Sequence, residues 1–430
     1  MERVISFFGL FVMILIAWLL SSHKRRFPWR VVAGGLFLQF AFAWMILRTG
    51  PGHAFFDGVD GVFNALMSCV NAGSDFVFGI FGQRENPDLP PRGTLLNTFA
   101  FGVLPSIIFF AAFMQMLYYV GIMQQIVRGL GFIVQRTLGT TGPESLAAAA
   151  NIFLGQTEAP LVVRPYVNTM TRSELMAVMV PGFGSTAGGV LIAFKAMGID
   201  AGHLLTASVL SAPASLLIAK VMLPETEKPR DVEKVEVEMG DSGANLLEAI
   251  SIGTLEGMKL ALNVGAMLIA FIALIALADG LLGWTGEQFH AAGVWLGWLN
   301  AVPPPDWSLS AIFSWIFSPI AWVMGIPWAD CPEAGDLLGR KMVANEFVAY
   351  GTLSEWIKPG SNVALEPRTV VILTYALCGF ANFSSIGIQI GGIGGMAPER
   401  RSDLAKLGLR AMLGGALANF MTACIAGMLL

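Results

Sequence analysis

Long apolar windows separated by short polar stretches dominate the hydropathy pattern of the chain. A bilayer core about 30 Å thick requires roughly 20 apolar residues in a helix that crosses it. Eight windows are long enough: residues 4–20, 31–47, 95–120, 174–198, 203–223, 257–282, 369–391 and 408–429. The pattern therefore predicts an all-α polytopic membrane protein with eight transmembrane helices.

Three stretches do not fit this pattern of spans. Residues 53–82 are apolar but are interrupted by glycines and by acids such as Asp57 and Asp60, which is typical of a helix along the membrane interface. The polar residues 83–93 end this segment. Residues 224–245 carry many charges and have no apolar face, so we expect a solvated cytoplasmic linker that divides the chain into halves.

Basic residues orient the predicted helices. A cationic cluster within residues 23–30 lies between the first two windows, and cytoplasmic loops carry an excess of Lys and Arg. The cluster therefore places the N-terminus outside, and the same topology puts loops with Arg128 and Arg136 inside. The first window could instead be a signal peptide, but no small-residue cleavage site precedes the cluster, so we predict a retained helix.

The two halves contain similar elements in the same order. Each half has a short segment with a central Glu, at residues 143–165 and 331–356, and then a span with a Gly-Phe interruption, at 181–189 and 379–387. Paired short or interrupted segments in two halves point to a transporter site at a repeat interface. Because loop polarity makes the first segment enter from the cytoplasm and the second from outside, we predict two opposed re-entrant helical hairpins in inverted repeats.

Each predicted hairpin carries an acid in apolar surroundings. Glu158 and Glu346 would each cost from about 2.5 to more than 10 kcal/mol there without compensation. A hydrophilic solute or a cation in a water-filled cavity would compensate them. The structural alternative is a salt bridge, with Arg164 serving Glu158 and Lys341 serving Glu346. The topology places Arg340 and Lys341 on the outer side, where pairing within the helix would explain them.

Polar side chains near the acids suit a solute with a heterocyclic ring. Gln156 and Thr157 directly precede the first acid, and their amide and hydroxyl can read donors and acceptors on the edge of a base. The alternative role for them is capping of broken helix ends. Asn382 and Ser385 are three residues apart and can share a helical face. Phe380 could stack on a planar ring, although an aromatic in a membrane protein is usually packing.

The interrupted helices suit a cation for a different reason. Unwinding exposes backbone carbonyls, which lipid excludes unless they face protein, water or an ion. Asn151, Ser185 and Thr186 supply oxygen donors that could combine with such carbonyls around a monovalent cation. Taken alone, however, a Ser-Thr pair in a membrane helix is more often a hydrogen-bonded kink.

Composition narrows the functional class. Charged residues make up 13% of the 430, against about 25% in a typical soluble domain, and the mean hydropathy is +0.66. A net charge of −4 without a long basic tract argues against nucleic acid as a partner. The four Cys and four His form no pair at metal-ligand spacing, so we expect neither a disulfide framework nor a zinc site.

Two longer motifs resemble a known family. Residues 155–161 (GQTEAPL) are similar to the first re-entrant hairpin of concentrative nucleoside transporters, and residues 339–350 (GRKMVANEFVAY) to the signature of that family. Residues 76–79 (FVFG) and 104–110 (LPSIIFF) are also similar to family stretches. The resemblance implies a bacterial cation-coupled nucleoside importer of the inner membrane, assembled as a homotrimer, with no enzyme activity and no cofactor besides the coupling ion.

The resemblance also implies roles for individual residues. The substrate-binding residues would be Gln156, Thr157 and Glu158 at the nucleobase with Val190 packing on it, and Glu346, Asn382 and Ser385 at the ribose hydroxyls with Phe380 close by. The sodium ligands would be the Asn151 side chain, the Leu154 and Thr186 carbonyls, and the Ser185 hydroxyl and carbonyl. Thr186 departs from the family, which often has an apolar residue there.

The family architecture implies a division of this chain into a scaffold and a transport domain that moves against it. The divisions are 1–120 (scaffold, helices 1–3 and an interfacial helix), 121–223 (transport domain, hairpin 1 and helices 4–5), 224–256 (polar linker), 257–282 (scaffold helix 6) and 283–430 (transport domain, an interfacial helix, hairpin 2 and helices 7–8).

The function that these features favour is a sodium-coupled symporter that imports nucleosides by alternating access. The nearest alternative keeps the fold but couples to protons, with Glu158 or Glu346 titrating. An intramembrane hydrolase is a weaker alternative because the chain has no HExxH or GxSxG spacing. A channel is also weaker, because broken helices with hairpin tips suit a carrier that occludes its solute.

Overall fold

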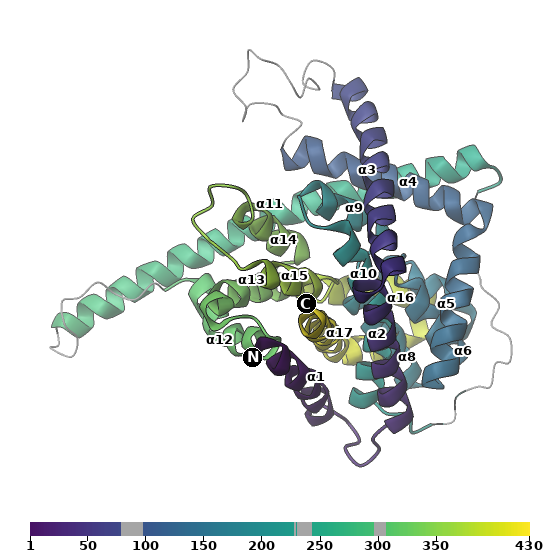
Figure 1. Ribbon diagram of the computed structural model, residues 1–430, viewed down its shortest axis with the longest axis horizontal. Helices are drawn as coiled ribbons and strands as arrows, with labels where there is room; N and C mark the ends of the chain where they lie inside the picture. Colours follow the sequence, from purple (N-terminus) through teal and green to yellow (C-terminus); the bar gives the residue numbers. More distant parts are fainter. Residues whose placement is uncertain (79–97, 228, 230–242, 296–306) are drawn as a thin grey trace.

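The computed structural model describes residues 1–78, 98–227, 229, 243–295 and 307–430, and the regular elements within them are helical (Figure 1). The helices of the first half are α1 (Glu2–Leu19), α2 (Trp29–Arg48), α3 (Gly50–Phe78), η3 (Phe99–Val103), α4 (Leu104–Val120), α5 (Ile122–Leu138), α6 (Gly142–Ala150), η4 (Ala159–Val163), α7 (Arg164–Val167), α8 (Arg172–Gly184), α9 (Gly188–Ala196) and α10 (Ala201–Met222). Those of the second half are α11 (Leu246–Trp295), α12 (Leu309–Val323), η5 (Trp328–Asp330), α13 (Cys331–Val343), α14 (Glu346–Trp356), α15 (Pro367–Leu377), α16 (Phe383–Met396), η6 (Pro398–Arg400) and α17 (Arg401–Leu429). The polar residues 83–93 and most of the predicted linker 224–245 lie outside the described residues.

Seven helical stretches in the described residues are long and apolar enough to cross a membrane: Glu2–Leu19, Trp29–Arg48, Phe99–Val120, Arg172–Ala196, Ala201–Met222, Leu246–Ala292 and Pro398–Leu429. Each overlaps a predicted window. The remaining window, 369–391, is divided into α15 and α16, so neither half alone is long enough to count as a span.

Both predicted interruptions are breaks in a helix. α8 contains Pro181, which lacks an N–H group, and ends at Gly184, after which Ser185 is extended at φ −121° and ψ 167° before α9 begins at Gly188. α15 ends at Leu377, and α16 begins only at Phe383. The sequence pattern therefore located both breaks correctly.

Two elements differ from the sequence-based prediction. Arg128 and Arg136 lie on α5 and not in a loop. Residues Met123, Val127 and Val134 are among those that α5 buries at helical spacing, while both arginines are exposed. The other difference is the length of α11, which continues past both ends of the predicted span 257–282.

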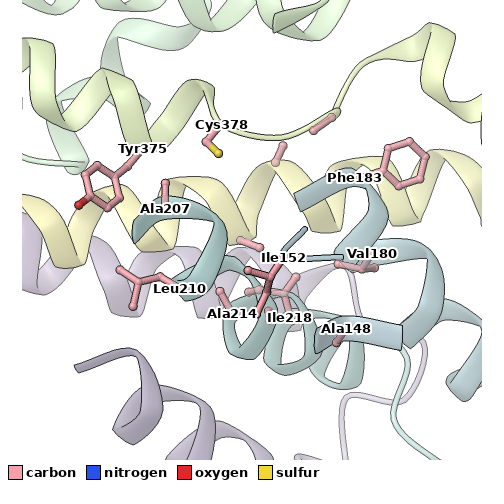
Figure 2. Close-up of a cluster of buried hydrophobic side chains, with 14 of the residues drawn as sticks. Ala148, Ile152, Val180, Phe183, Ala207, Leu210, Ala214, Ile218, Tyr375 and Cys378 are labelled. Atoms are coloured by element: carbon pink, nitrogen blue, oxygen red, sulfur yellow. The ribbon is translucent and has the colours of Figure 1, made fainter. Parts of the chain in front are cut away.

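α17 lies at the centre of the fold and packs against α1, α8, α10, α15 and α16 (Figure 1). Figure 2 shows part of the core beside it, where apolar side chains of α8, α10 and α15 meet those of the first hairpin. Ile152, Val180, Phe183 and Leu210 are nearly or fully buried there. This packing fixes both broken helices against one shared partner.

α11 has the opposite environment. It packs closely beside α4, but much of its apolar surface is exposed on the single chain. The large exposed side chains on it include Leu255, Leu262, Ile269, Ile272, Leu277 and Leu281. Such a face requires lipid or another protein surface in the membrane.

Candidate functional site

The first predicted hairpin is a helix, a tight tip and a second, 3-10 helix. α6 ends at Ala150, and η4 begins at Ala159 with Pro160 in its first turn. The backbone N–H groups of Glu158 and Ala159 both donate to the Gly155 carbonyl, at 3.1 and 3.0 Å. The Glu158 carboxylate accepts from the Gly155 N–H at 3.0 Å. Glu158 therefore helps to close the tip on which it lies.

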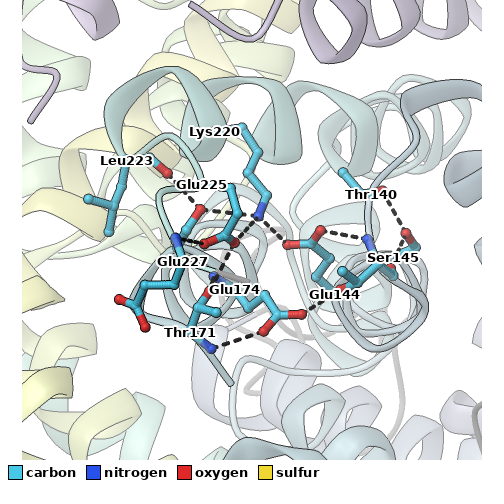
Figure 3. Close-up of polar contacts among 11 residues, drawn as sticks. Thr140, Glu144, Ser145, Thr171, Glu174, Lys220, Leu223, Glu225 and Glu227 are labelled. Atoms are coloured by element: carbon cyan, nitrogen blue, oxygen red, sulfur yellow. Dashed lines mark hydrogen bonds and ion pairs between the residues drawn. The ribbon is translucent and has the colours of Figure 1, made fainter. Parts of the chain in front are cut away.

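Figure 3 shows how the base of this hairpin is fixed. α6 and α8 each begin with a capping box, formed by Thr141 with Glu144 and by Thr171 with Glu174. The Thr141 hydroxyl donates to Glu174 at 2.8 Å, which joins the two helix ends. The Lys220 ammonium of α10 lies 2.6 Å from a Glu144 carboxylate oxygen. The base is thus held by charge, while the tip lies at the other end of α6.

The second predicted hairpin consists of α13 and α14, separated by Ala344 and Asn345. The Asn345 side chain caps α14 by accepting from the Val348 N–H at 3.0 Å. Glu346 is the first residue of α14 and is only 3% exposed. A carboxylate at a helix N-terminus faces the positive end of the helix dipole, which favours its charge.

The break in the next span places a second cap beside Glu346. The Asn382 side chain oxygen caps α16 by accepting from the Ser385 N–H at 2.9 Å. Its amide nitrogen donates to the Glu346 carboxylate at 3.0 Å. Asn382 therefore performs both the capping role and the contact with the acid, and it ties hairpin 2 to α16.

The tip of hairpin 1 also contacts the N-terminus of α16. The Gln156 amide nitrogen donates to the Ser385 hydroxyl at 3.1 Å. Gln156, Ser385, Asn382 and Glu346 are thus connected by hydrogen bonds, with the Ser385 backbone N–H making the link to Asn382, and we call these four residues the polar bridge. Their exposures are 7%, 2%, 2% and 3%. The Gln156 side chain oxygen is buried without a donor among the described residues, so it is available to a ligand N–H group.

The other predicted substrate residues are placed differently. Glu158 is exposed and, among the described residues, has no hydrogen bond or ion pair to the polar bridge or to Arg164. Thr157 packs against α16 at Gly392. Val190 is fully buried on α9, and Phe380 is half-buried between α15 and α16. The salt bridge from Arg164 to Glu158 that the sequence allowed is not formed.

The predicted sodium ligands lie at the first hairpin and the first helix break. Asn151 is 1% exposed, and its amide nitrogen donates to the Ala147 carbonyl at 2.9 Å. Its side chain oxygen is buried without a donor in the described part of the chain. Leu154 and Ser185 are also buried, and Ser185 donates to the Pro181 carbonyl at 2.7 Å. A buried oxygen without a donor is a feature that a monovalent cation would satisfy.

The Thr186 side chain has a separate role. Its hydroxyl accepts from the Gly379 N–H at 2.8 Å, so the break of the first half touches the break of the second. Gly379 has φ +108°, and a Cβ there would lie 2.7 Å from the Phe183 carbonyl oxygen and 2.8 Å from the Asn419 side chain oxygen. The Thr186 hydroxyl thus links the two helix breaks, and it is a separate group from the carbonyl that is predicted as a sodium ligand.

Lys341 requires a correction. It does not pair with Glu346, because its ammonium donates to the Ala376 carbonyl at 2.9 Å, to the Asn419 side chain at 3.1 Å and to the Cys378 carbonyl at 3.4 Å. It is fully buried, so protein oxygens and not solvent surround its charge. Arg340 is paired within its helix as predicted, by a 2.8 Å contact with Asp336.

Sequence reasoning missed two buried amides. Asn419 of α17 accepts from Lys341 and donates to the Gly184 carbonyl at 2.7 Å. Gln389 of α16 donates to the Met179 carbonyl at 3.2 Å. An amide inside an apolar span is a signal that would have identified Asn419. Gln389 follows Ser385 by four residues, and this helical spacing would have placed Gln389 on the same face of the helix as Ser385.

Three family models match the sequence. They are described as Na+ dependent nucleoside transporter C-terminus (residues 203–427), Na+ dependent nucleoside transporter N-terminus (residues 8–81) and nucleoside recognition (residues 100–200). Together they account for most of the chain.

Similar proteins include an uncharacterized transporter of Haemophilus influenzae, 44% identical over 100% of this chain and 98% of that protein. Solute carrier family 28 member 3 of Homo sapiens is 43% identical, and sodium/nucleoside cotransporter 1 of Sus scrofa is 40% identical. Both match 100% of this chain, which spans 60% and 64% of their respective lengths.

Similar solved structures are those of CNTnw. In an inward-facing substrate-bound state it is 41% identical, with a TM-score of 0.90 over 100% of this chain and 98% of that one. A variant in an outward-facing state gives a TM-score of 0.91 at the same identity, over 100% of this chain and 99% of that one. These neighbours are transporters and not enzymes. The chain belongs to the Na+ dependent nucleoside transporter family.

Proposed function

We propose that this protein imports nucleosides together with sodium by alternating access. The observation that carries the proposal is the polar bridge, in which side chains of both hairpins meet at the N-terminus of α16. A nucleoside has one planar ring with donors and acceptors and one sugar with hydroxyl groups. A site with an amide contributed by one hairpin and a carboxylate by the other matches that division.

The ribose hydroxyls would bind Glu346, Asn382 and Ser385. A carboxylate accepts hydrogen bonds from hydroxyl groups, and Glu346 lies buried at a helix N-terminus that favours its charge. A ribose would take part of the hydrogen bonding that Asn382 now gives to Glu346. Phe380 would pack beside the sugar.

The nucleobase would bind at the tip of hairpin 1. The Gln156 oxygen is an acceptor without a donor among the described residues, and Thr157 and Glu158 add a hydroxyl and an exposed carboxylate. Val190 would pack on the ring from α9. The alternative role, capping of broken helix ends, is not what Gln156 and Thr157 do in the described residues, because η4 has no side-chain cap hydrogen bond and the Gln156 amide donates to Ser385.

Sodium would bind between hairpin 1 and the first helix break. The Asn151 and Ser185 side chains and the Leu154, Ser185 and Thr186 carbonyls are neutral oxygen ligands of the kind that a hard cation prefers. Because Asn151 and Gln156 belong to the same hairpin tip, an ion bound at Asn151 would order the residues that bind the base. This ordering would couple sodium to the solute.

Alternating access requires one part of the chain to move against another. CNTnw has been solved in inward-facing and outward-facing states, and this chain resembles both. We assign residues 1–120 and α11 to a scaffold, 224–245 to the linker, and 121–223 and 307–430 to the moving domain. The sequence-based divisions after residues 256 and 282 fall inside α11, which is continuous from Leu246 to Trp295 and packs beside α4, so we do not keep them. The two hairpins would be re-entrant. α15 and α16 would together make the eighth crossing of the membrane. In a bacterial inner membrane, the exposed apolar face of α11 would contact lipid or the other subunits of a homotrimer.

Uptake of radiolabelled uridine and adenosine into proteoliposomes tests the proposal, with sodium and proton gradients imposed separately. We expect accumulation driven by an inward sodium gradient. Accumulation driven by a pH gradient without sodium would instead support the proton-coupled alternative, in which Glu158 or Glu346 titrates. The absence of uptake of either nucleoside under both gradients would refute the proposed function.

A further inference from the structure

The buried ammonium of Lys341 is surrounded by neutral oxygens. An ammonium has three N–H donors, and three oxygens receive them: the carbonyls of Ala376 and Cys378 and the side chain of Asn419. Within the described ranges, no carboxylate lies close enough to Lys341 to form an ion pair with it. The three hydrogen bonds of the ammonium therefore all go to neutral oxygens, and the Glu346 carboxylate attracts it only at longer range.

Two of these oxygens, the carbonyls of Ala376 and Cys378, lie at a helix break. α15 ends at Leu377, and the Ala376 and Cys378 carbonyls lie at that end. A helix C-terminus has carbonyls without partners in the helix and carries the negative end of the dipole, so it attracts a cation. Inside a membrane these carbonyls must be satisfied by protein, water or an ion.

The first half has the same arrangement of ligands. There, the candidate sodium site combines the amide oxygen of Asn151 with carbonyls at the break that follows α8. In the second half, the amide oxygen of Asn419 is combined with carbonyls at the break that follows α15. Each site thus consists of one Asn oxygen and the carbonyls of a broken helix.

Lys341 reaches the second break from a place along its hairpin that is similar to the place of Asn151 in the first hairpin. Asn151 caps the first helix of hairpin 1, and Lys341 lies in the last turn of α13, the first helix of hairpin 2. In each hairpin the tip acid, Glu158 or Glu346, follows within a few residues. The two halves differ in the source of the Asn oxygen, which is hairpin 1 in the first half and α17 in the second.

We propose that the Lys341 ammonium is a built-in cation, which occupies in the second half the position that sodium occupies in the first. This inference rests on the proposed function for the sodium site alone. It predicts that the second half takes no coupling ion, and that the oxygens of Ala376, Cys378 and Asn419 bind a small monovalent cation when the ammonium is removed.

The built-in cation is connected to the sodium site. Asn419 accepts from Lys341 through its oxygen and donates to the Gly184 carbonyl through its nitrogen. Gly184 immediately precedes Ser185, one of the candidate sodium ligands. Lys341 is thus a positioning residue, which acts on the ion site through Asn419 and does not touch the solute.

Chemical rescue of Lys341→Ala tests the inference. This variant removes the ammonium and leaves space, and we expect sodium-driven uridine uptake to fall by roughly tenfold to hundredfold, the value of a charge-assisted hydrogen bond. Propylammonium should restore uptake, because it replaces the missing part of the side chain. Lys341→Met is the matched control, since it fills the same space without charge and should not be rescued.

Two measurements do not depend on transport. In purified protein without nucleoside, propylammonium should raise the melting temperature of Lys341→Ala but not of the wild type or Lys341→Met. A high sodium concentration should also raise the melting temperature of Lys341→Ala. In uptake measurements, the Hill coefficient for sodium should rise from about one in the wild type to about two in Lys341→Ala. If Lys341→Ala folds poorly, extraction in propylammonium should recover it.

The inference is overturned if Lys341→Ala transports like the wild type, or if neither propylammonium nor sodium affects its uptake, melting temperature or recovery. Failure of the wild type to take up nucleosides would refute the proposed function instead. In that case the propylammonium shift of Lys341→Ala still decides whether the second break is a cation site.

Discussion

The Gln156 amide donates to the Ser385 hydroxyl at 3.1 Å, although 229 residues separate the two along the chain. This bond joins the tip of hairpin 1 to the first turn of α16. Because Asn382 in the same turn contacts Glu346, one helix end brings both hairpins together. The arrangement gives each of the following substitutions an expected effect.

Replacing Glu346 by Ala should abolish nucleoside uptake while leaving the protein folded. The substitution removes the only carboxylate of the polar bridge, and a hydrogen bond to a charged group contributes roughly 1.5–3 kcal/mol. This corresponds to a loss of about tenfold to hundredfold in affinity, which brings uptake at low uridine concentration close to background. Uptake of radiolabelled uridine measures the effect. Glu355→Ala is the matched control, because Glu355 lies on the same helix with its side chain 69% exposed. Transport by Glu346→Ala at the rate of Glu355→Ala would remove the ribose-binding role from Glu346.

The two roles of Asn382 can be separated. Asn382→Ala should lose both uptake and about 1 kcal/mol of stability, because it removes the cap of α16 as well as the contact with Glu346. Asn382→Ser keeps a capping oxygen but loses the amide donor. We expect its melting temperature to be close to that of the wild type and its uptake to remain low. Recovery of uptake together with stability would mean that the cap alone matters.

Gly379→Ala should prevent the normal crossing of the two broken helices. The residue has φ +108°, which L side chains rarely adopt, and its Cβ would lie within 2.8 Å of two oxygens from other helices. We expect a loss of stability of roughly 1–3 kcal/mol, measured as a lower melting temperature in detergent. Gly387→Ala in α16 is the control, because nothing lies within 4 Å of its Cβ position. Equal melting temperatures of the two variants would contradict the proposed tight crossing.

Asn151→Ala should weaken the dependence of uptake on sodium. The substitution removes a buried oxygen that has no donor among the described residues and is proposed to bind the ion. Uridine uptake measured over a range of sodium concentrations should require at least about tenfold more sodium for half-maximal rate, as expected for one lost charge-assisted contact. Asn168, which is exposed, provides the control Asn168→Ala. An unchanged sodium dependence in Asn151→Ala would exclude this residue from the ion site.

Local sequence features predicted the parts of the site that depend on unusual residues in apolar segments. Glu158 and Glu346 stand out because isolated acids are costly in a membrane, and Pro181 and Gly379 mark the breaks that the structure contains. The family resemblance added Val190 to the predicted substrate residues and the Leu154 carbonyl to the predicted ion ligands. The short segment predicted at residues 331–356 coincides with α13 and α14.

Contacts between distant segments were not predictable in the same way. Lys341 is five residues from Glu346, so proximity along the chain left a salt bridge open as an alternative, whereas packing turns its ammonium toward α15 and α17. Asn419 has no neighbouring motif, and its role depends on where α17 passes both breaks. α5 was missed because Arg128 and Arg136 suggested a loop, although its buried positions recur at helical spacing.

The central claim is that both hairpins contribute to one nucleoside site. The binding of uridine to the purified protein in the presence of sodium tests this claim most directly. Calorimetric titration of the wild type, Gln156→Ala, Glu346→Ala and the double variant would show whether the two residues act on the same ligand. The account predicts that each single variant binds uridine at least about tenfold more weakly than the wild type, the value of one hydrogen bond to a buried polar group. Wild-type affinity in both single variants would contradict the account.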